Sequence, residues 1–444
     1  MSSDFAAPTS DALERDAHLA STDHKVEPSE IAMGVIIGRT SEFFDFFVFG
    51  IASVLVFPKV FFPFADPLTA TLYAFGIFAL AFVARPIGSV LFMEIDRRHG
   101  RGVKLTIALF LLGFSTAAIS FLPGYDHLGR TAIVLLAAFR IGQGLALGGA
   151  WDGLASLLAL NAPESRRGWY AAMPQLGAPL GFMLASALFS FFLANLTPED
   201  FLDWGWRYPF YVAFAVNVVA LFARLRLVAT DEFVNLLQTR ELEPVPVLEL
   251  LRVHWRHVLI AAFVPLASFA LFHLVTIFPI SWITLFTQRS AGEFLMVQFA
   301  GATMAAGAIL ASGLMADQIG RRTMLAVCAG LIALFAVGSI LAPLLFGDSM
   351  AGQTVYVVVG FGLLGLSYGQ TAGAVSSNFG ARYRYTGSAL SSDLAWVVGA
   401  GFAPLVVLSL SSRYGLACVG LYLLSGAVAT LVALGVNKLE ARTA

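Results

Sequence analysis

Charged side chains stand inside long apolar stretches of this sequence, where ionised groups are costly. The first such stretch contains Arg39, Glu42 and Asp45 at successive spacings of three residues. On a helix this spacing brings neighbouring side chains within reach of each other. A charge left unpaired in hydrocarbon is strongly unfavourable, so each group needs a partner or a wet cavity. Asp45 and Glu42 are therefore candidates for reversible protonation, and Arg39 is a candidate ligand for an anion.

Two interpretations of this cluster stay open. In the first, the charges neutralise each other structurally, with Arg39 pairing Glu42 or with Arg85 of the next stretch pairing Asp45. In the second, a carboxylate exchanges its cation partner for a proton. Burial favours the protonated form of a carboxyl group and a nearby arginine favours the ionised form, so a change of partner can switch protonation. Asp45 is the first choice because it lies deeper in the stretch than Glu42.

A second set of polar residues follows in the first half of the chain. Arg140, Gln143 and Asp152 share one apolar stretch. Arg140 either binds a substrate carboxylate with two hydrogen bonds or holds a proton-coupling acid. Gln143 is a further candidate for substrate binding and Asp152 for proton coupling. Gln175 stands between Pro174 and Gly177, which break or bend a membrane helix where polar groups face protein or water, so its amide can orient a polar solute.

The second half contains fewer such groups. Asp393 is a candidate second proton site, or it caps a broken helix. Gln370 is a candidate ligand for substrate. His273 lies among aromatic and aliphatic residues, where a histidine is either a hydrogen-bonded packing residue or a proton relay that contacts substrate.

Composition places the chain in a membrane. It has 444 residues, of which 58% are hydrophobic and 12% charged, and its mean hydropathy is +0.80. A soluble domain carries about 25% charged residues. The net charge of −1 gives no basic surface for nucleic acid, and the two cysteines lie in apolar stretches without metal-ligand spacing. Without a nucleophile–base set or phosphate loop, we expect neither an enzyme nor a bound cofactor.

Two short loops repeat one pattern in the two halves of the chain. The first is GSVLFMEIDRRHGR (Gly88–Arg101) and the second is GLMADQIGRRT (Gly313–Thr323). Each lies between apolar stretches of about 20 residues, the length that crosses a bilayer. A repeated loop at matching places indicates a duplicated helical bundle.

The apolar stretches predict twelve membrane helices. We place them near 31–57, 68–92, 103–122, 131–157, 168–194, 207–226, 257–287, 293–316, 323–345, 353–377, 385–410 and 414–437. Residues 31–226 then form an N-terminal bundle and 257–437 a C-terminal bundle. The polar segment 227–256 is the expected cytoplasmic linker, 1–30 a disordered cytoplasmic tail and 438–444 a short tail.

Loop charge predicts the orientation, because cytoplasmic loops are enriched in lysine and arginine. The loops on one side contain Arg97, Arg98, Arg101, Lys104, Arg166, Arg167, Arg321, Arg322, Arg382 and Arg384, whereas those on the other side contain isolated cations. Both termini are therefore expected in the cytoplasm.

The sequence resembles the major facilitator superfamily. Five segments resemble motifs of its metabolite:proton symporter branch. They are SEFFDFFVFG in the first helix, RIGQG (Arg140–Gly144), PQLGAPLG (Pro174–Gly181), WGWRYPF (Trp204–Phe210) and RYRYTG (Arg382–Gly387). Members of that branch carry shikimate, 2-oxoglutarate, citrate, proline or betaine. The resemblance implies an all-α membrane protein with twelve helices in two pseudo-symmetric six-helix bundles. It also places Asp45 at a position that the branch keeps acidic.

The repeated loops are candidate gates in that family. Their residues here are Asp96, Arg97, Arg98, Gly100 and Arg101 in the first, and Asp317, Gly320, Arg321 and Arg322 in the second. Such charges can latch one conformation and release another, although topology anchors would need the same cations. The first loop departs from the family pattern, because Arg97 occupies the usual aspartate position and Asp96 comes one residue earlier. We expect the latch on that side to be weaker or differently wired.

The sequence thus predicts a secondary transporter that imports a small organic acid or zwitterion by proton symport through alternating access. Proton-antiport efflux of an apolar metabolite or drug, and a solute sensor that does not transport, are the alternatives. Its expected partners are protons, one small-molecule substrate and the lipid of a bacterial inner membrane, in which it works as a monomer.

Overall fold

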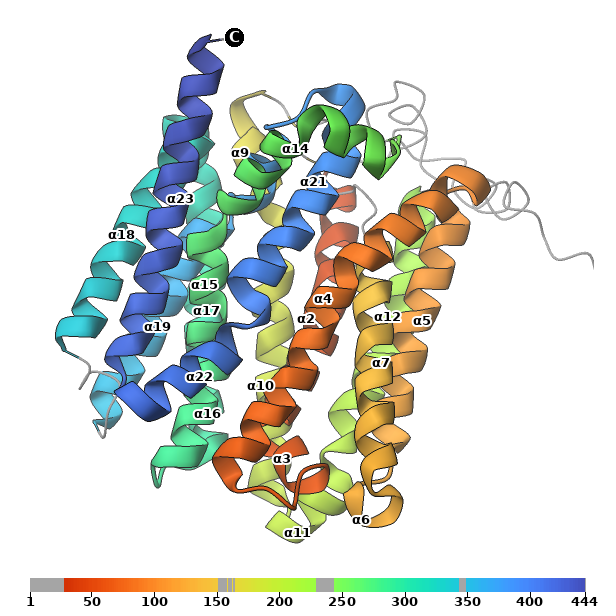
Figure 1. Ribbon diagram of the computed structural model, residues 1–444, viewed down its shortest axis with the longest axis vertical. Coiled ribbons are helices and arrows are strands. Elements are labelled where there is room, and N and C mark those ends of the chain that lie inside the picture. The colour runs from red at the N-terminus through yellow and green to blue at the C-terminus, as the bar shows by residue number, and fades with distance from the viewer. Residues whose placement is uncertain are drawn as a thin grey trace, which may run out of the picture.

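The computed structural model describes residues 28–150, 158, 162, 164–228, 243–342 and 349–443. Within these residues all regular secondary structure is helical (Figure 1). The C-terminus lies at the same end of the molecule as α14 (Val247–Phe263), and we call this the upper end, as Figure 1 draws it. The predicted acid Asp152 lies outside the described residues.

The first half of the chain forms the right-hand side of the molecule in Figure 1. Its long helices are α2 (Pro28–Leu55), α4 (Pro67–His99), α5 (Arg101–Phe121), α7 (Arg130–Gly149), α10 (Gly177–Asn195) and α12 (Arg207–Val228). Short helical pieces join or extend them: α3 (Phe57–Val60), α6 (Tyr125–Leu128), η1 (Glu164–Arg166), α9 (Arg167–Ala172), η2 (Met173–Leu176), α11 (Pro198–Asp200) and η3 (Phe201–Gly205).

The second half forms the left-hand side and contains more interrupted helices. After α14 come α15 (Leu266–Val275), α16 (Ile277–Phe286), α17 (Ala291–Ile319), α18 (Arg321–Leu341), α19 (Met350–Tyr368), α20 (Thr371–Ser376), α21 (Ala381–Ala395), η5 (Trp396–Gly401), α22 (Ala403–Tyr414) and α23 (Ala417–Thr443). The two halves meet along α10 and α17, and α4 packs against η5.

Eleven helical segments of the described residues are long and apolar enough to cross a membrane. α2 is 28 residues long but is not among them, because it carries Arg39, Glu42 and Asp45. These are the charges that the sequence singled out, and they are buried or half-buried inside the protein rather than exposed to lipid. With α2, the helices fit the predicted twelve-helix fold.

One predicted span begins later than expected, and the helix before it was not predicted. The span expected at 257–287 begins at Leu266, because residues up to Phe263 belong to α14. That helix starts inside the predicted linker 227–256 and buries Leu250 and Val258 while Arg252 stays exposed. It is an amphipathic helix, and the charged residues on its polar face led to its prediction as a polar linker.

The break between α15 and α16 has a chemical cause. Pro279 has no N–H and therefore leaves the carbonyl of Val275, four residues earlier, without a helical partner. The amide of Gln298 on α17 donates to the carbonyl oxygens of Val275, at 2.8 Å, and Thr276, at 2.6 Å. A buried side chain thus replaces hydrogen bonds that lipid could not supply.

Glycines let α4 and α7 touch backbone to backbone. A Cβ on Gly144 would lie 2.3 Å from the carbonyl oxygen of Ala81, and one on Gly148 would lie 2.3 Å from that of Arg85. Such distances leave no room for a methyl group. The α7 glycines thus allow close helix packing, and this contact fixes Arg85 relative to α7.

Gly144→Ala should therefore destabilise the protein, because the new methyl group must push α4 and α7 apart. Overpacking of this kind costs about 1–3 kcal/mol, which a thermal unfolding scan in detergent would record as a lower midpoint. Gly76→Ala on α4 is the matched control, since a Cβ there meets no atom within 4 Å. Equal midpoints for the two variants would contradict the packing described here.

Candidate functional site

A small cavity lies between the two halves of the molecule. Its volume is about 30 Å³, and its lining residues come from α2, α4, α7 and η5: Arg39, Glu42, Phe43, Phe46, Ala81, Phe82, Arg85, Leu147 and Trp396. This is the space of roughly one or two water molecules. This cavity is too small for a metabolite and must widen to admit one.

The two halves contact each other on both sides of this cavity. Towards the lower end, the hydroxyl of Ser190 donates to the carbonyl of Gly292 at 3.0 Å. α2 and α16 also approach so closely that a Cβ on Gly50 would lie 2.7 Å from Ile277 Cδ1. The repeated loops make the corresponding contacts at the upper end.

Arg39 and Glu42 form an ion pair at the cavity wall. The distance between Arg39 Nη1 and Glu42 Oε2 is 2.6 Å, and the arginine lies 5.1 Å above the ring of Phe43. The arginine side chain is 21% exposed and the glutamate 8%. The geometry matches the sequence-based interpretation in which Arg39 and Glu42, three residues apart, neutralise each other.

The second charged pair at the cavity joins the two halves. Arg85 Nε of α4 lies 2.6 Å from Asp393 Oδ1 of α21. Ser89, one turn after Arg85, donates a hydrogen bond to the other oxygen of Asp393. The pairing of Arg85 with Asp45, one of the two alternatives above, is wrong, because the guanidinium points across the interface and not towards α2.

Asp45 lies in a polar network within the first half. Its carboxylate accepts hydrogen bonds from the hydroxyl of Thr116, at 2.5 Å, and from the amide of Gln143, at 3.2 Å. Gln143 in turn accepts from Arg140 Nη1 at 2.9 Å. The side chains of Asp45, Gln143 and Arg140 are all buried. Arg140 therefore supports Asp45 through Gln143, and of its two predicted roles the geometry favours holding an acid.

His273 is enclosed by aromatic rings on the other side of the interface. The rings of Phe46, Phe78 and Phe272 lie 5.4–5.7 Å from its imidazole. Neither ring nitrogen has a partner among the described residues, and the same is true of Arg140 Nη2. The histidine is fully buried but not hydrogen-bonded, so it differs from the satisfied packing residue that the sequence allowed.

Of the predicted ligands, Arg39 lines the cavity, and Gln175 and Gln370 lie away from it, as do Arg140, Gln143 and His273. Gln175 sits in η2 beside α2 and its side-chain oxygen has no partner among the described residues. Gln370 lies at the junction of α19 and α20, where its amide reaches the carbonyl of Gly168 at 3.5 Å. Gln370 thus belongs spatially to the upper gate.

The second repeated loop binds directly to the first half. Asp317 accepts hydrogen bonds from the backbone N–H groups of Gly168, at 2.5 Å, and Trp169, at 3.1 Å. Arg321 adds a hydrogen bond to the carbonyl of Arg167 at 2.9 Å. Arg322 instead bonds to the carbonyl of Leu434 in its own half. An aspartate on one half thus caps the first turn of a helix on the other.

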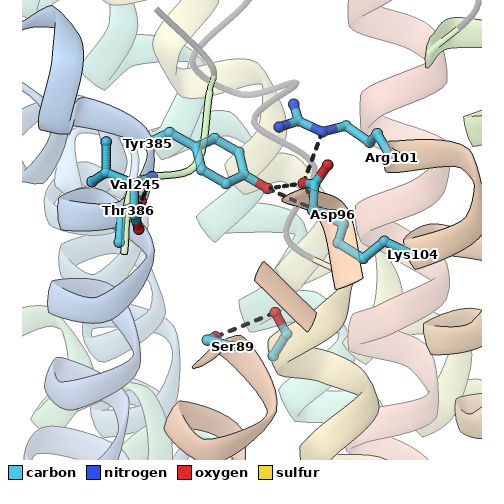
Figure 2. A network of polar contacts seen from close by, with 8 residues as sticks. Ser89, Asp96, Arg101, Lys104, Val245, Tyr385 and Thr386 are labelled. Atoms are coloured by element: carbon cyan, nitrogen blue, oxygen red, sulfur yellow. Dashed lines mark hydrogen bonds and ion pairs between the residues drawn. The ribbon is translucent and has the colours of Figure 1, made fainter. Parts of the chain in front are cut away.

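The first repeated loop is wired differently, as its altered sequence predicts. Asp96 pairs with Arg101 and Lys104 of its own half, each at 3.1 Å. The link to the other half runs through Tyr385 of α21, whose hydroxyl accepts from Lys104 at 2.8 Å and donates to Asp96 at 3.5 Å (Figure 2). A phenol thus takes the place of the direct carboxylate contact.

The other cations of this loop stay on their own helix. Arg97 and Arg98 pair with Glu94 and are exposed, so they fit topology anchors better than a latch. Gly100 and Gly320 have φ of 83° and 84°, which glycine adopts at little cost. They make equivalent turns from α4 to α5 and from α17 to α18, which confirms the duplication at the level of the backbone.

Sequence reasoning missed several members of these networks. Thr116 and Ser89 are buried polar residues in apolar stretches, and only that unusual setting marks them in the sequence. Tyr385 belongs to the RYRYTG motif, but its role in the gate was not predicted. Trp396 was overlooked because an aromatic residue in a membrane helix usually contacts lipid or packs between helices.

Comparison with known proteins agrees with this architecture. The sequence profile of the Major Facilitator Superfamily matches residues 35–404. The chain is 37% identical to the inner membrane metabolite transport protein YhjE of Escherichia coli strain K12, with 91% of this chain and 93% of that protein covered. The shikimate transporter of that strain is 29% identical, with coverages of 89% and 91%. Its proline/betaine transporter is 27% identical, with coverages of 89% and 80%.

A solved structure has the same fold. The proton:xylose symporter XylE bound to 6-bromo-6-deoxy-D-glucose superimposes with a TM-score of 0.69 at 17% identity, over 92% of this chain and 94% of that one. The fold and profile define a multi-pass membrane transporter rather than an enzyme. The chain belongs to the major facilitator superfamily, and the predicted fold is confirmed.

Tyr385→Phe should loosen the upper gate, because it removes the hydroxyl that joins Lys104 and Asp96. A hydrogen bond contributes about 0.5–1.5 kcal/mol, so the closed state should lose about two- to tenfold in population. Maleimide labelling of a Leu147→Cys reporter in the cavity would measure this, after Cys328 and Cys418 are replaced. Faster labelling is expected with Tyr385→Phe but not with the control Tyr414→Phe, which lies on the exposed surface. Equal rates would show that Tyr385 is no latch.

Proposed function

We propose that this protein imports a small organic acid or zwitterion together with protons. The observation that carries the proposal is the ion pair between Arg85 and Asp393, which joins the two halves beside the central cavity. Alternating access requires the halves to move relative to each other. The ion pair between the halves depends on the charge of the Asp393 carboxyl group. Protonation of that group therefore acts directly on the motion.

Charge balance then couples the proton to the substrate. When Asp393 takes up a proton, Arg85 loses its anionic partner, and an unpaired buried cation costs about 3–5 kcal/mol. A carboxylate on the incoming substrate can replace Asp393 at the guanidinium. The site then has the same net charge before and after loading, so proton and anion are favoured together and neither is favoured alone.

The remaining cavity wall limits the shape of the substrate. Arg39 and Glu42 provide a second, balanced pair of charges, and Phe43, Phe82 and Trp396 provide flat apolar surface. A carboxylate with a compact ring or methyl-bearing body fits these walls. The positive end of a zwitterion could also interact with Glu42 and the aromatic faces. The similarity to transporters of shikimate and of proline and betaine supports the same two classes.

Asp393 and Asp45 compete for the proton-coupling role. The sequence favoured Asp45, whose described hydrogen bonds all stay within the first half. Asp393 is bonded to the other half and touches a residue of the cavity lining. We therefore assign the coupling step to Asp393 and a supporting role, tuned through Gln143 and Arg140, to Asp45. His273 and the free Arg140 Nη2 lie near enough to the same aromatic wall to contact substrate once the cavity widens.

The proposed orientation places the upper end in the cytoplasm of a bacterial cell. The arginines of both repeated loops lie at that end, in agreement with the positive-inside rule. The relative from the inner membrane of Escherichia coli supports this location. A monomer is sufficient for the mechanism, because both halves of the site come from one chain.

Uptake into proteoliposomes with an inward proton gradient tests the proposal. One pH unit corresponds to about 1.36 kcal/mol, enough for about tenfold accumulation of a monocarboxylate that enters with one proton. Labelled carboxylates and betaines would be offered with and without a protonophore. Accumulation should collapse with the protonophore, whereas proton release on addition of apolar compounds would indicate efflux.

Asp393→Asn should abolish uphill accumulation but keep exchange of internal for external substrate, because a permanently neutral side chain cannot carry a proton across. Retained exchange in this variant would show that the loss of accumulation is not caused by an orphan cation that blocks substrate binding. Asp203→Asn, at an exposed position, is the control. Normal accumulation by Asp393→Asn together with its loss in Asp45→Asn would move the coupling role to Asp45.

A further inference from the structure

A long apolar groove runs between α14 and α23 on the outer surface of the second half. Its volume is about 700 Å³. Leu259 and Phe263 of α14 form one wall, and Leu421, Val428 and Val432 of α23 form the other, with Ser425 as the polar exception. These side chains are 39–59% exposed. The groove is separate from the central cavity, and the transport cycle proposed above does not use it.

The dimensions of the groove suit a lipid chain. Its lining on α23 extends from Leu421 to Val436, which is about 22 Å of helix at 1.5 Å per residue. One leaflet of a bilayer has a hydrocarbon thickness of about 15 Å. An acyl chain that enters at the upper end can therefore lie along the groove over the full depth of its leaflet.

The upper mouth of the groove is basic. Arg256 is exposed and lies one turn before Leu259 and Ile260 on α14, and the exposed Arg252 precedes it on the other side of the kink at His254. No described residue forms an ion pair with either arginine. Trp255 is 51% exposed and lies 5.6 Å below the guanidinium of Arg256. Tryptophan and arginine beside an apolar surface are typical of the level of lipid headgroups.

α14 also connects this mouth to the upper gate. Glu249 of α14 pairs with Arg382 of α21 at 2.7 Å and accepts a hydrogen bond from Tyr383 at 3.1 Å. The ring of His254, where α14 is kinked, lies 4.7 Å from that of Tyr383. α21 carries the gate residue Tyr385 two positions later. A ligand that holds α14 in place therefore also holds the helix that closes the gate.

We propose that the groove between α14 and α23 binds an anionic phospholipid, with one acyl chain between the helices and its phosphate at Arg256 and Arg252. A second copy of the chain would also cover the apolar walls, but it would leave the two arginines without an anion. The combination of a membrane-depth groove with a basic mouth selects the lipid. Binding of the lipid here requires neither the proposed substrate nor proton coupling.

Native mass spectrometry of the detergent-purified protein tests this site with phosphatidylglycerol as probe and phosphatidylcholine as the neutral comparison. Each cation near the headgroup contributes about fivefold in affinity. The Arg252→Gln/Arg256→Gln variant should therefore retain phosphatidylglycerol at least fivefold less well, with little change for phosphatidylcholine. Ser425→Trp, which fills the groove, should displace the lipid while leaving the arginines in place.

The control is Leu334→Trp on α18, at an exposed apolar position outside the groove. Ala429→Trp is a second variant that fills the groove, and it should also displace the lipid. The same loss in both variants argues against a folding defect in one of them as its cause. Equal retention of phosphatidylglycerol by all variants would overturn the proposal. A dimer that disappears in the groove variants, with lipid retention unchanged, would assign the groove to a second copy of the chain instead.

Discussion

A charge buried in a membrane protein must be matched by another charge or a polar group, and the centre of this protein is organised around that constraint. Arg39 is matched by Glu42, Arg85 by Asp393, and Arg140 by Gln143 and the aromatic faces that surround it. Only the second of these contacts crosses from one half to the other. Because its two partners separate when the halves move, it is the point at which an exchange of charge can control conformation.

The two repeated loops both connect one half of the molecule to the other, but they do so through different side chains. Both turn at a glycine with positive φ, which fixes where the following arginine begins its helix. The second loop presents Asp317 directly to backbone N–H groups of the other half. The first has its aspartate one residue earlier, which rotates it towards Arg101 and Lys104, so that Tyr385 must complete the connection. A shift of one residue on a helix thus changes which element forms the gate.

The sequence could predict contacts that depend on local spacing. Arg39 and Glu42 are three residues apart, so pattern alone identified their pairing. It could not pair Arg85 with Asp393 or Lys104 with Tyr385, because those partners are separated by 308 and 281 residues and meet only when the bundles pack. α14 was missed for another reason. Its charges lie on one face, and a prediction from average composition does not separate the charged face of a helix from its apolar face.

Infrared difference spectroscopy of the reconstituted protein tests the central claim most directly, because it observes the protonation of a carboxyl group as substrate binds. The account predicts that a carboxylic-acid C=O band appears on substrate addition in the wild-type protein and is absent in Asp393→Asn. The band should persist in Asp45→Asn. If substrate binds and the Asp393 carboxyl group stays ionised, the exchange of partners at Arg85 is not the coupling step.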